Sequence, residues 1–364
     1  MTEERYLSYL CLKTAPELNL KGCLELLKLY PDPQSFVGVE DHQLYRQGIL
    51  KQATIRHLKE FVLPANQLQI LQLMRHYQIE CVAITDEQYP AKLREIFAPP
   101  LLLYIRGDLD SALQNKCLAV VGTRKASSYG REMSRKLLTP LCQQGLCVIS
   151  GLALGIDTAA HHIALESGAQ TIGVLACGVE SIYPPQNLQL SERIIKQGAL
   201  VSEYEPGSKP DKWNFPARNR IISALSDAVF VVEGPITSGA LLTAKAAIEQ
   251  NRDIFALPGN INHSNAQGPN HLIKHGAALI SSADDLFEAL DMKPEKAEQI
   301  ELFPELCPDE QKIVDILKEK QEVLSFDELL MISSFPIGRL STHLTNLELK
   351  GVIAKESGNS FFIR

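Results

Sequence analysis

From residue 116 onward, short apolar runs alternate with segments whose apolar residues recur at helical spacing. The runs have the length of buried strands, and most are followed by a glycine-containing turn and an amphipathic helix. Strands that are apolar at every position are typical of a parallel sheet covered on both faces. The pattern therefore predicts a doubly wound, Rossmann-like α/β domain. The expected strands are Leu118–Gly122, Leu146–Ser150, Thr171–Leu175, Ala228–Val232 and Asp253–Leu257, with helices over roughly 128–144, 156–167, 186–197 and 239–250.

The N-terminal flank has a different pattern. Residues 4–12, 18–29 and 67–77 carry apolar positions at helical spacing, so we expect a small helical domain over residues 1–78. Two strand-like runs follow, Cys81–Ile84 and Leu101–Ile105, and they should join the edge of the central sheet.

The C-terminal flank begins with residues 291–308, which are acidic and interrupted by prolines, as is typical of a linker. Helical patterns over 311–320, 326–332 and 336–350 then precede two strand-like runs around Gly358, which is the order of a winged helix. The predicted domains are thus 1–78 (helical), 79–290 (Rossmann-like), 291–308 (linker) and 309–364 (winged helix).

Composition is that of an ordinary globular protein, with 45% apolar and 22% charged residues among 364. No run of eighteen apolar residues and no basic-then-apolar leader occurs, so we expect neither a membrane span nor secretion. The eight cysteines are scattered and form no Cys-x-x-Cys, which favours reduced thiols in a cytoplasmic protein and gives no zinc-finger spacing.

Charge is unevenly distributed along the chain. The formal net charge of −7 opposes polyanion binding over the whole surface. However, residues 116–258 hold fourteen Lys and Arg against twelve Asp and Glu (14 − 12 = +2), whereas residues 291–364 hold nine against fourteen (9 − 14 = −5). A polyanion site is therefore expected to be local to the central domain.

The predicted strand ends are rich in glycine. In doubly wound sheets, ligands bind beyond the carboxyl ends of the strands, where glycine lets backbone approach a ligand and helix N-termini offer N–H groups to phosphate. One such glycine is ordinary turn geometry, but five such ends, with Arg124 beside the first, predict an anion-binding rim. Ser127 or Ser128, Asp157 and Ser238 are the expected N-caps. The five ends are Gly122–Lys125, Ser150–Asp157, Ala176–Gly178, Glu233–Gly239 and Pro258–Gly259.

The segment Lys209–Arg220 concentrates cations and aromatic rings. Its twelve residues include four Lys or Arg, the single Trp of the chain (Trp213) and Phe215, with one acidic residue among them. We interpret the segment as a loop, and a loop of cations and flat rings suits single-stranded nucleic acid, which offers both phosphates and π-faces. The alternative is a solvated basic loop whose rings turn inward to anchor it.

Motifs for nucleotide or cofactor chemistry are missing. Neither the P-loop pattern nor a Gly-x-Gly-x-x-Gly after the first strand occurs. Asp157 and His161, four apart on a predicted helix, are either an acid/base or metal pair or a cap followed by helix surface, and we favour the second interpretation. His271 and His275 are also four apart but lack a third ligand. We expect no catalytic residue, no cofactor and no metal.

Several motifs occur in order over roughly residues 85–290. They are Val120–Arg124 with Ser128–Gly130, Ser150–Asp157, Tyr183–Pro185, Asn214–Pro216 with Arg218–Ser223, Ser238–Gly239 with Leu242–Ala244, and Ala256–Gly259. Together they resemble the DNA-processing protein A (DprA/Smf) family. The resemblance implies an N-terminal SAM-like domain and a C-terminal winged helix. It also implies a cytoplasmic bacterial homodimer, without established catalysis, that binds single-stranded DNA, protects incoming strands in natural transformation and helps load the RecA recombinase.

By the same resemblance, Arg124 and Lys212 would hold phosphates, Phe215 would meet a base, and Arg218 and Arg220 would border the groove. Each of these cations can neutralise a phosphate, and Phe215 or Trp213 can stack bases without selecting a sequence. The complete expected site for single-stranded DNA is Gly122, Thr123, Arg124, Ser150, Gly151, Lys212, Trp213, Phe215, Arg218, Asn219, Arg220, Ser238 and Gly239.

Two other functions stay open from the sequence. A nucleotide-cleaving enzyme, such as a phosphoribohydrolase on a related fold, would use Asp157, His161 and Glu233, although its Pro-Gly-Gly-x-Gly-Thr-x-x-Glu signature is absent. A pure adaptor would recruit partners through the flanking domains. The predicted winged helix carries seven Lys and Arg against nine Asp and Glu over residues 309–364. Its candidate recognition helix offers only Arg339 and Lys350, so we favour protein contact there over the reading of duplex DNA.

Overall fold

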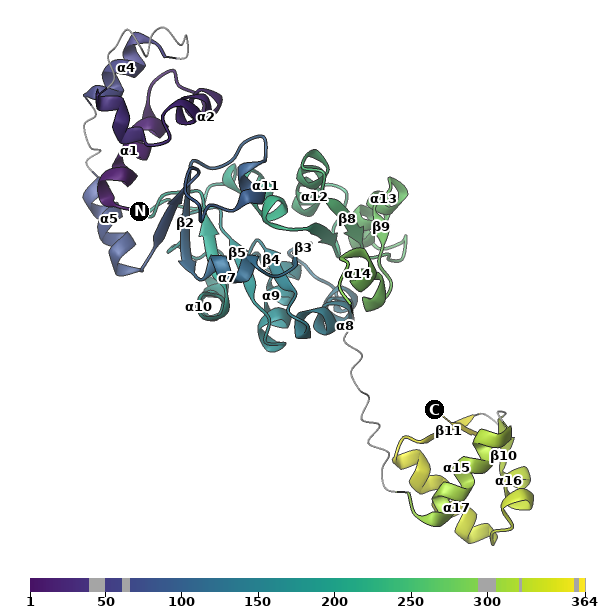
Figure 1. Ribbon diagram of the computed structural model, residues 1–364. Coiled ribbons are helices and arrows are strands. Elements are labelled where there is room, and N and C mark those ends of the chain that lie inside the picture. Colours follow the sequence, from purple (N-terminus) through teal and green to yellow (C-terminus); the bar gives the residue numbers. More distant parts are fainter. Residues whose placement is uncertain (39–49, 61–65, 294–305, 321–322, 357–359, 364) are drawn as a thin grey trace. The chain divides into compact units, whose positions relative to one another are not determined.

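The computed structural model describes residues 1–38, 50–60, 66–293, 306–320, 323–356 and 360–363 (Figure 1). The chain folds into two compact units, Met1–Pro294 (unit 1) and Glu295–Arg364 (unit 2). Each unit has a hydrophobic core of its own.

A single sheet forms the centre of unit 1. Its strands in the described residues are β1 (Glu80–Ala83), β2 (Leu102–Gly107), β3 (Cys117–Val121), β4 (Cys147–Ser150), β5 (Thr171–Val174), β6 (Ala199–Ser202), β7 (Ala228–Val231), β8 (Asp253–Ala256) and β9 (Ala278–Leu279). They lie in the order β1-β2-β6-β5-β4-β3-β7-β8-β9. Between β6 and β9 in this order, every pair of neighbouring strands is parallel, whereas β2 is antiparallel to both β1 and β6. The order reverses at β3, between β4 and β7, and such a reversal leaves a crevice at the carboxyl ends of the strands.

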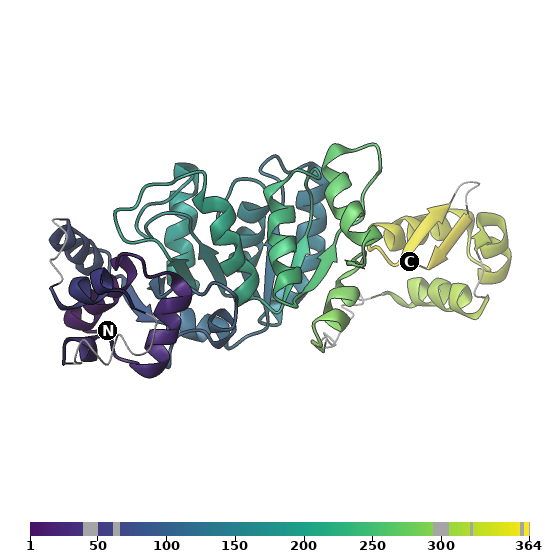
Figure 2. The same cartoon turned by 90° about the horizontal axis from the view of Figure 1, so that it is seen from above.

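Helices cover both faces of this sheet (Figure 2). They are α6 (Ala91–Arg94), α7 (Leu109–Leu113), α8 (Ser128–Gln143), α9 (Ile156–Glu166), η2 (Pro185–Asn187), α10 (Leu188–Gln197), α11 (Asn214–Leu225), α12 (Gly239–Glu249), η3 (Ser264–Ala266), α13 (Gln267–Lys274) and α14 (Ala283–Ala289). On one face α14, α8, α9 and α10 pack side by side in that order, and on the other α6, α11 and α12 do so. None of the helices in the described ranges has both the length and the apolarity needed to cross a bilayer.

Strand β3 shows how the sheet is buried on both sides. Leu118 and Val120 belong to the cluster that includes α8, α9 and α14, while Ala119 and Val121 belong to the cluster that includes α11 and α12. All four side chains are buried. Because burial stabilises by about 25 cal/mol per Å² of apolar surface on either face, every position of the run is apolar.

The N-terminal helices pack against the antiparallel edge of the sheet. They are α1 (Glu3–Thr14), α2 (Leu20–Leu29), η1 (Pro33–Gly38), α4 (Gln52–Lys59) and α5 (Gln67–His76). Their buried side chains share one hydrophobic cluster with β1 and β2. The hydroxyl groups of Tyr6 in α1 and Tyr104 in β2, both buried, lie 3.2 Å apart. The helical segment is therefore part of unit 1.

The predicted parallel sheet is confirmed. The two strand-like runs Cys81–Ile84 and Leu101–Ile105 form β1 and β2 at its edge, as expected. Neither β6 nor α11 was predicted. The interpretation of residues 209–220 as a loop was wrong for its second half, because α11 begins at Asn214. Pro216 lies in the first turn of α11, where proline is tolerated because its missing N–H leaves no intrahelical bond unmade.

Unit 2 has the winged-helix architecture predicted from the sequence. Its elements are α15 (Pro308–Lys320), β10 (Leu324–Ser325), α16 (Phe326–Ser333), α17 (Ile337–Leu349), β11 (Ile353–Glu356) and β12 (Ser360–Ile363). The strands form an antiparallel sheet in the order β10-β12-β11, over a core that includes Ile313, Leu329 and Leu340. Most of the predicted linker (294–305) and the hairpin tip around Gly358 lie outside the described residues.

Replacing Leu340 by Ala should destabilise unit 2 alone. Leu340 is fully buried in the core of that unit, and a Leu→Ala change in a core costs about 2–5 kcal/mol of unfolding free energy. Calorimetry of the full chain should show the transition of unit 2 lowered and that of unit 1 unchanged. Leu349→Ala, at a position that is 83% exposed on the same helix, is the matched control. A lowered transition of unit 1 would contradict the division into two units.

Candidate functional site

A depression of about 350 Å³ lies at the crevice where the strand order reverses. We refer to it as the β3–β7 pocket. It is formed by the turn after β3, the loop after β4, the loop between β7 and α12, and the first turns of α9, α11 and α12. Its lining residues are Val121, Gly122, Thr123, Arg124, Ala153, Asp157, Phe215, Arg218, Asn219, Ile222, Pro235, Ser238, Gly239, Ala240 and Thr243.

Two glycines allow the turn after β3 to lie against the start of α9. A Cβ atom on Gly122 would lie 2.5 Å from the side chain of Ile156, and one on Gly155 would lie 2.2 Å from the carbonyl oxygen of Thr123. Gly155 also has a φ of +88°, which side chains disfavour. The amide of Ile156 donates to the carbonyl of Thr123 at 3.2 Å. Arg124 is therefore presented from a backbone that is held in place.

Arg124 and Phe215 form a cationic and aromatic wall of the pocket. The guanidinium carbon of Arg124, an exposed residue, lies 5.5 Å from the ring centroid of Phe215. The ring of Tyr183, which is 42% exposed, lies 5.7 Å from that of Phe215 between centroids, with the planes tilted by 56°. Tyr183 was missed as a site residue, although the Tyr-Pro-Pro motif after β5 was a signal that could have pointed to it.

Lys212 and Trp213 lie just before α11 and outside the pocket lining. Lys212 is exposed, and its Nζ lies 5.1 Å from the ring centroid of Trp213. Trp213 is 73% exposed, so the interpretation of this ring as an inward anchor was wrong. Both residues lie within three positions of Phe215 and offer a further cation and a further ring face to the solvent.

The N-termini of α11 and α12 both lie at the pocket. Ser238 is the N-cap of α12 and accepts a hydrogen bond from the amide of Ala240 at 3.0 Å. Trp213 stands at the N-cap of α11 and makes no side-chain capping bond. Helix N-termini carry partial positive charge and favour anions. Ser127 and Ser238 are thus confirmed as N-caps, whereas Asp157 lies in the first turn of α9.

Beneath the pocket, Arg218 and Asp157 are both buried, and each is bonded to the backbone. Arg218 Nη1 donates to the carbonyl of Gly151 at 2.8 Å and also to the carbonyl of Val174. The carboxylate of Asp157 accepts from the amides of Gly151 at 3.1 Å and Ala153 at 3.4 Å. Burial lowers the pKa of Arg218 to about 10, although the charge of Asp157 opposes the shift, so Arg218 stays a cation at neutral pH. Burial also raises the pKa of Asp157, and Arg218 opposes that shift.

Three expected DNA contacts are not presented to the pocket as the sequence suggested. Arg218 lines the floor, but it is only 5% exposed and bonded to backbone carbonyls, so it does not border a groove. Arg220 lies away from the pocket, with Nη2 2.6 Å from Glu203. The side chains at 218 and 220 diverge because two residues turn a helix by about 200°. Ser150 is fully buried, and its hydroxyl donates to the carbonyl of Val120 at 2.6 Å.

Gly151 also lies beneath the pocket surface, and its lack of a side chain leaves room for the guanidinium of Arg218. A Cβ atom on Gly151 would lie 2.6 Å from Nη2 of Arg218. The remaining predicted residues meet at the pocket: Gly122, Thr123, Arg124, Phe215, Asn219, Ser238 and Gly239.

Groups suited to acid–base chemistry are engaged within the protein. Glu233 accepts from the amide and the hydroxyl of Ser127, at 2.9 and 2.5 Å. His161 is fully buried, with Nδ1 2.7 Å from the hydroxyl of Thr171, which itself donates to the carbonyl of Val148. Nδ1 must therefore carry the proton that bonds to Thr171. Burial lowers the pKa of His161 to about 3, so the ring is neutral. The expectation that this histidine lies on the helix surface was wrong.

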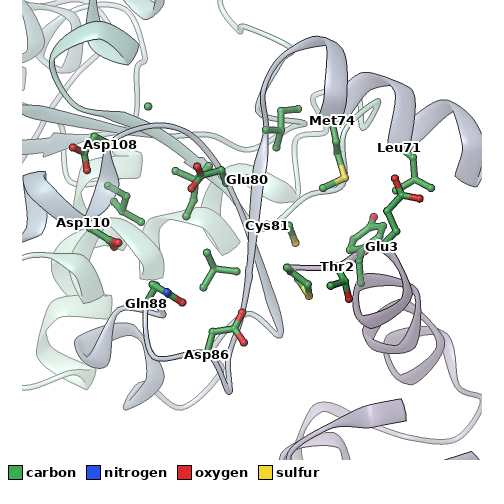
Figure 3. A pocket seen from close by; sticks show the side chains of 17 residues that line it. Thr2, Glu3, Leu71, Met74, Glu80, Cys81, Asp86, Gln88, Asp108 and Asp110 are labelled. Carbon is green, nitrogen blue, oxygen red and sulfur yellow. The ribbon is translucent and has the colours of Figure 1, made fainter.

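A larger cavity of about 700 Å³ lies elsewhere, between the N-terminal helices and β1 (Figure 3). Five acidic side chains are among its described lining residues, which include no Lys or Arg: Glu3, Glu80, Asp86, Asp108 and Asp110. Glu3 and Asp86 are paired with Arg75 and Arg5, but the carboxylates of Glu80, Asp108 and Asp110 still oppose a phosphate backbone. Volume therefore does not identify the site for an anion, and charge favours the smaller β3–β7 pocket.

Comparison with known proteins gives consistent matches. The profile of the family described as DNA recombination-mediator protein A matches residues 80–291, and that described as DprA winged helix domain matches residues 301–359. The chain is 42% identical over 222 residues to the DNA processing protein DprA of Bacillus subtilis (strain 168), which covers 61% of this chain and 75% of that protein.

Solved structures agree with these matches. DNA processing protein A from Streptococcus pneumoniae has 34% identity and a TM-score of 0.67, covering 77% of this chain and 97% of that one. DNA processing protein A from Helicobacter pylori, whose structure is described as giving insights into a single-stranded DNA binding mode, has 32% identity and a TM-score of 0.55. It covers 60% of this chain and 99% of that one. Residues 80–291 of this chain, which match the first family profile, include every residue that lines the β3–β7 pocket.

The buried His161 should make stability fall in mild acid. Its pKa is about 3 when folded and about 6.5 when unfolded, so the unfolded chain binds more protons between these values. The contribution of His161 to the free energy of unfolding is complete above pH 6.5 and is lost as the pH falls towards 3. Relative to His161→Asn, the unsubstituted chain should lose about 2 kcal/mol more unfolding free energy between pH 7 and pH 5. Denaturant titrations at each pH measure this, with the exposed His263→Asn as control. Parallel pH profiles for the chain and His161→Asn would contradict a buried neutral ring.

Proposed function

The chain belongs to the DNA-processing protein A (DprA/Smf) family, and from this premise we propose that it binds single-stranded DNA at the β3–β7 pocket. The observation that carries the proposal is the exposed guanidinium of Arg124, 5.5 Å from the ring centroid of Phe215, on a turn held by the backbone. A cation beside a partly exposed aromatic ring matches a strand that alternates phosphates with bases.

Each part of the pocket has a role in this proposal. Arg124 and Lys212 neutralise phosphates, and Arg124 can do so through two parallel N–H donors. The N-termini of α11 and α12 add partial positive charge and backbone donors for phosphate oxygens. The rings of Phe215, Tyr183 and Trp213 offer faces on which bases stack. Stacking does not discriminate between bases, so we propose weak sequence preference.

We further propose that the protein acts by binding and not by catalysis. The sequence left open a nucleotide-cleaving enzyme that uses Asp157, His161 and Glu233. Asp157 is buried and bonded to backbone amides, His161 is buried and neutral, and Glu233 is bonded to Ser127 at the start of α8. Because these side chains are already bonded within the protein or are buried and neutral, they favour a binding function over catalysis. On this proposal, incubation with nucleoside monophosphates releases no free base.

Family membership supports the wider role. We propose a cytoplasmic homodimer that protects incoming single strands in natural transformation and helps load the RecA recombinase onto them. For the winged helix we propose contact with protein and not with duplex DNA. The two cations of its candidate recognition helix are both paired within unit 2, since Arg339 bonds to Asp309 and Lys350 Nζ lies 2.6 Å from Glu310.

Replacing Arg124 and Lys212 together by Ala should weaken the binding of a short oligothymidylate. A hydrogen bond to a charged group contributes about 1.5–3 kcal/mol, so the loss of two should lower affinity by about 150-fold or more. The slope of log affinity against log salt should also fall by about 1.4, since each phosphate contact on a single strand contributes about 0.7. Fluorescence anisotropy across salt concentrations measures both quantities.

The matched control is Arg135→Ala with Lys136→Ala, which removes the same charge from exposed positions on α8. An equal loss of affinity in this control would show that net charge, and not the pocket, governs binding. Unchanged binding by the variant at Arg124 and Lys212 would place the site elsewhere.

Replacing Phe215 by Leu should separate stacking from charge. Leu keeps an apolar side chain but removes the ring, and a stacked base contributes about 1–3 kcal/mol, or roughly 5- to 150-fold in affinity. The salt slope should stay unchanged because no phosphate contact is lost. Phe97→Leu, at a fully exposed position, is the control. A changed salt slope or an unaltered affinity would argue against a ring that stacks on a base.

A further inference from the structure

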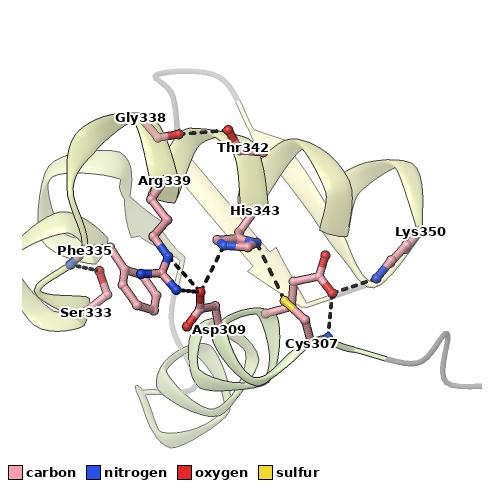
Figure 4. A network of polar contacts seen from close by, with 10 residues as sticks. Cys307, Asp309, Ser333, Phe335, Gly338, Arg339, Thr342, His343 and Lys350 are labelled. Carbon is pink, nitrogen blue, oxygen red and sulfur yellow. Dashed lines mark hydrogen bonds and ion pairs between the residues drawn. The ribbon is translucent and has the colours of Figure 1, made fainter.

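Unit 2 contains a cluster of metal-binding side chain types that has no part in the proposed DNA site (Figure 4). Cys307 lies directly before α15, Glu310 lies in the first turn of α15, and His343 lies on α17. One ligand atom of each residue, taken as Sγ, a carboxylate oxygen and a ring nitrogen, lies within 4.8 Å of the other two.

The spacing of the thiol and the imidazole fits a shared ion. Cys307 Sγ lies 3.9 Å from Nδ1 of His343. In a tetrahedral zinc site with Zn–S of about 2.3 Å and Zn–N of about 2.0 Å, sulfur and nitrogen lie roughly 3.5 Å apart. The observed pair is within a few tenths of an ångström of that separation, so only a small adjustment would bring both atoms onto one ion.

The imidazole is oriented for this task by its other nitrogen. His343 Nε2 lies 3.3 Å from Oδ2 of Asp309, a carboxylate that also accepts from Arg339 at 2.8 Å. A proton on Nε2 that bonds to this carboxylate leaves the lone pair of Nδ1 directed at the sulfur. A carboxylate that holds the far nitrogen of a histidine is the usual outer partner of a metal-bound imidazole.

Glu310 supplies the third donor as an anion. It is buried, and its Oε2 accepts from the Lys350 ammonium at 2.6 Å and from the amide of Cys307 at 2.9 Å. A metal ion would compete with Lys350 for this carboxylate.

We propose that Cys307, Glu310 and His343 form a binding site for a thiophilic divalent cation, zinc above all, with Asp309 as the positioning residue. A thiolate and an imidazole select zinc over magnesium and calcium, which prefer oxygen ligands. A bound ion would tie the start of α15 to α17 and so stabilise unit 2.

A nucleophilic cysteine with a histidine base is the competing interpretation of the same atoms. Glu310 favours the metal, because its carboxylate adds a third ligand atom within 4.8 Å of those of the thiol and the imidazole. The prediction from the sequence was that no metal is bound, since the thiol and the imidazole are 36 positions apart and form no recognised spacing.

Metal binding is tested on the reduced, tag-free full chain by titration with Co²⁺ and then Zn²⁺. We expect one Co²⁺ per chain, with the near-ultraviolet charge-transfer absorption of a cobalt–thiolate bond, and its displacement by Zn²⁺. Cys307→Ser and His343→Ala should each weaken binding roughly 10-fold or more. His271→Ala with His275→Ala, which removes the exposed histidine pair of α13, should leave it unchanged. Absence of the thiolate band, or loss of binding only in the α13 variant, would overturn the proposal.

Two further variants should move affinity in opposite directions. Asp309→Asn removes the anionic partner of His343 Nε2 and should weaken binding about 10- to 100-fold. Lys350→Met removes the cation that competes for Glu310 and should strengthen it. A purely structural role for this network predicts no gain in affinity from Lys350→Met, so a weakened or unchanged affinity in that variant would count against Glu310 as a ligand.

A measurement on the unsubstituted chain avoids any failure of variants to fold. Cys307 is the exposed thiol among the described cysteines, the other seven being buried. Saturating Zn²⁺ should slow its alkylation by iodoacetamide, followed by mass spectrometry of the peptide. An alkylation rate that zinc does not alter would overturn the site.

Discussion

The buried guanidinium of Arg218 is the interaction on which the candidate site depends. It bonds to the carbonyls of Gly151 after β4 and Val174 at the end of β5, and its charge interacts with that of Asp157 on α9. One side chain of α11 thereby joins two strand ends. Removing it would leave these buried carbonyls without their donor, and a buried polar group that loses its partner costs about 1–3 kcal/mol. Phe215, one turn earlier on α11, owes its place at the pocket to this anchor.

A charged side chain is available to a ligand only where it is not already bonded to another group of the protein. The segment 209–220 contains four cations, but Arg218 is bonded to carbonyls and Arg220 to Glu203. Lys212 is exposed, and Arg124 from a different turn completes the positive surface. The acidic cavity near β1 lies at the other end of the sheet order from β7 and β8. A chain of net charge −7 can therefore expose cations locally without a basic surface overall.

Much of the fold and half of the site were accessible from the sequence. The apolar runs predicted β3, β4, β5, β7 and β8, because two-sided burial requires an apolar residue at every position. The glycine-rich ends predicted where a ligand would approach, and the pocket does lie at Gly122–Arg124 and Ser238–Gly239. These features are encoded by neighbours along the chain, as were the winged-helix order and the motifs that resemble the family.

What only the tertiary structure decided is which polar side chains are free. Arg218 has acceptors 67 and 44 positions away, and the thiol and imidazole near α15 meet across 36 positions. His161 is buried because its helix turns that position towards Thr171 of β5. Periodicity reports the burial of apolar residues, since their transfer from water needs no specific partner. Burial of a polar group is favourable only with a partner in place, and the position of that partner is a property of the folded chain.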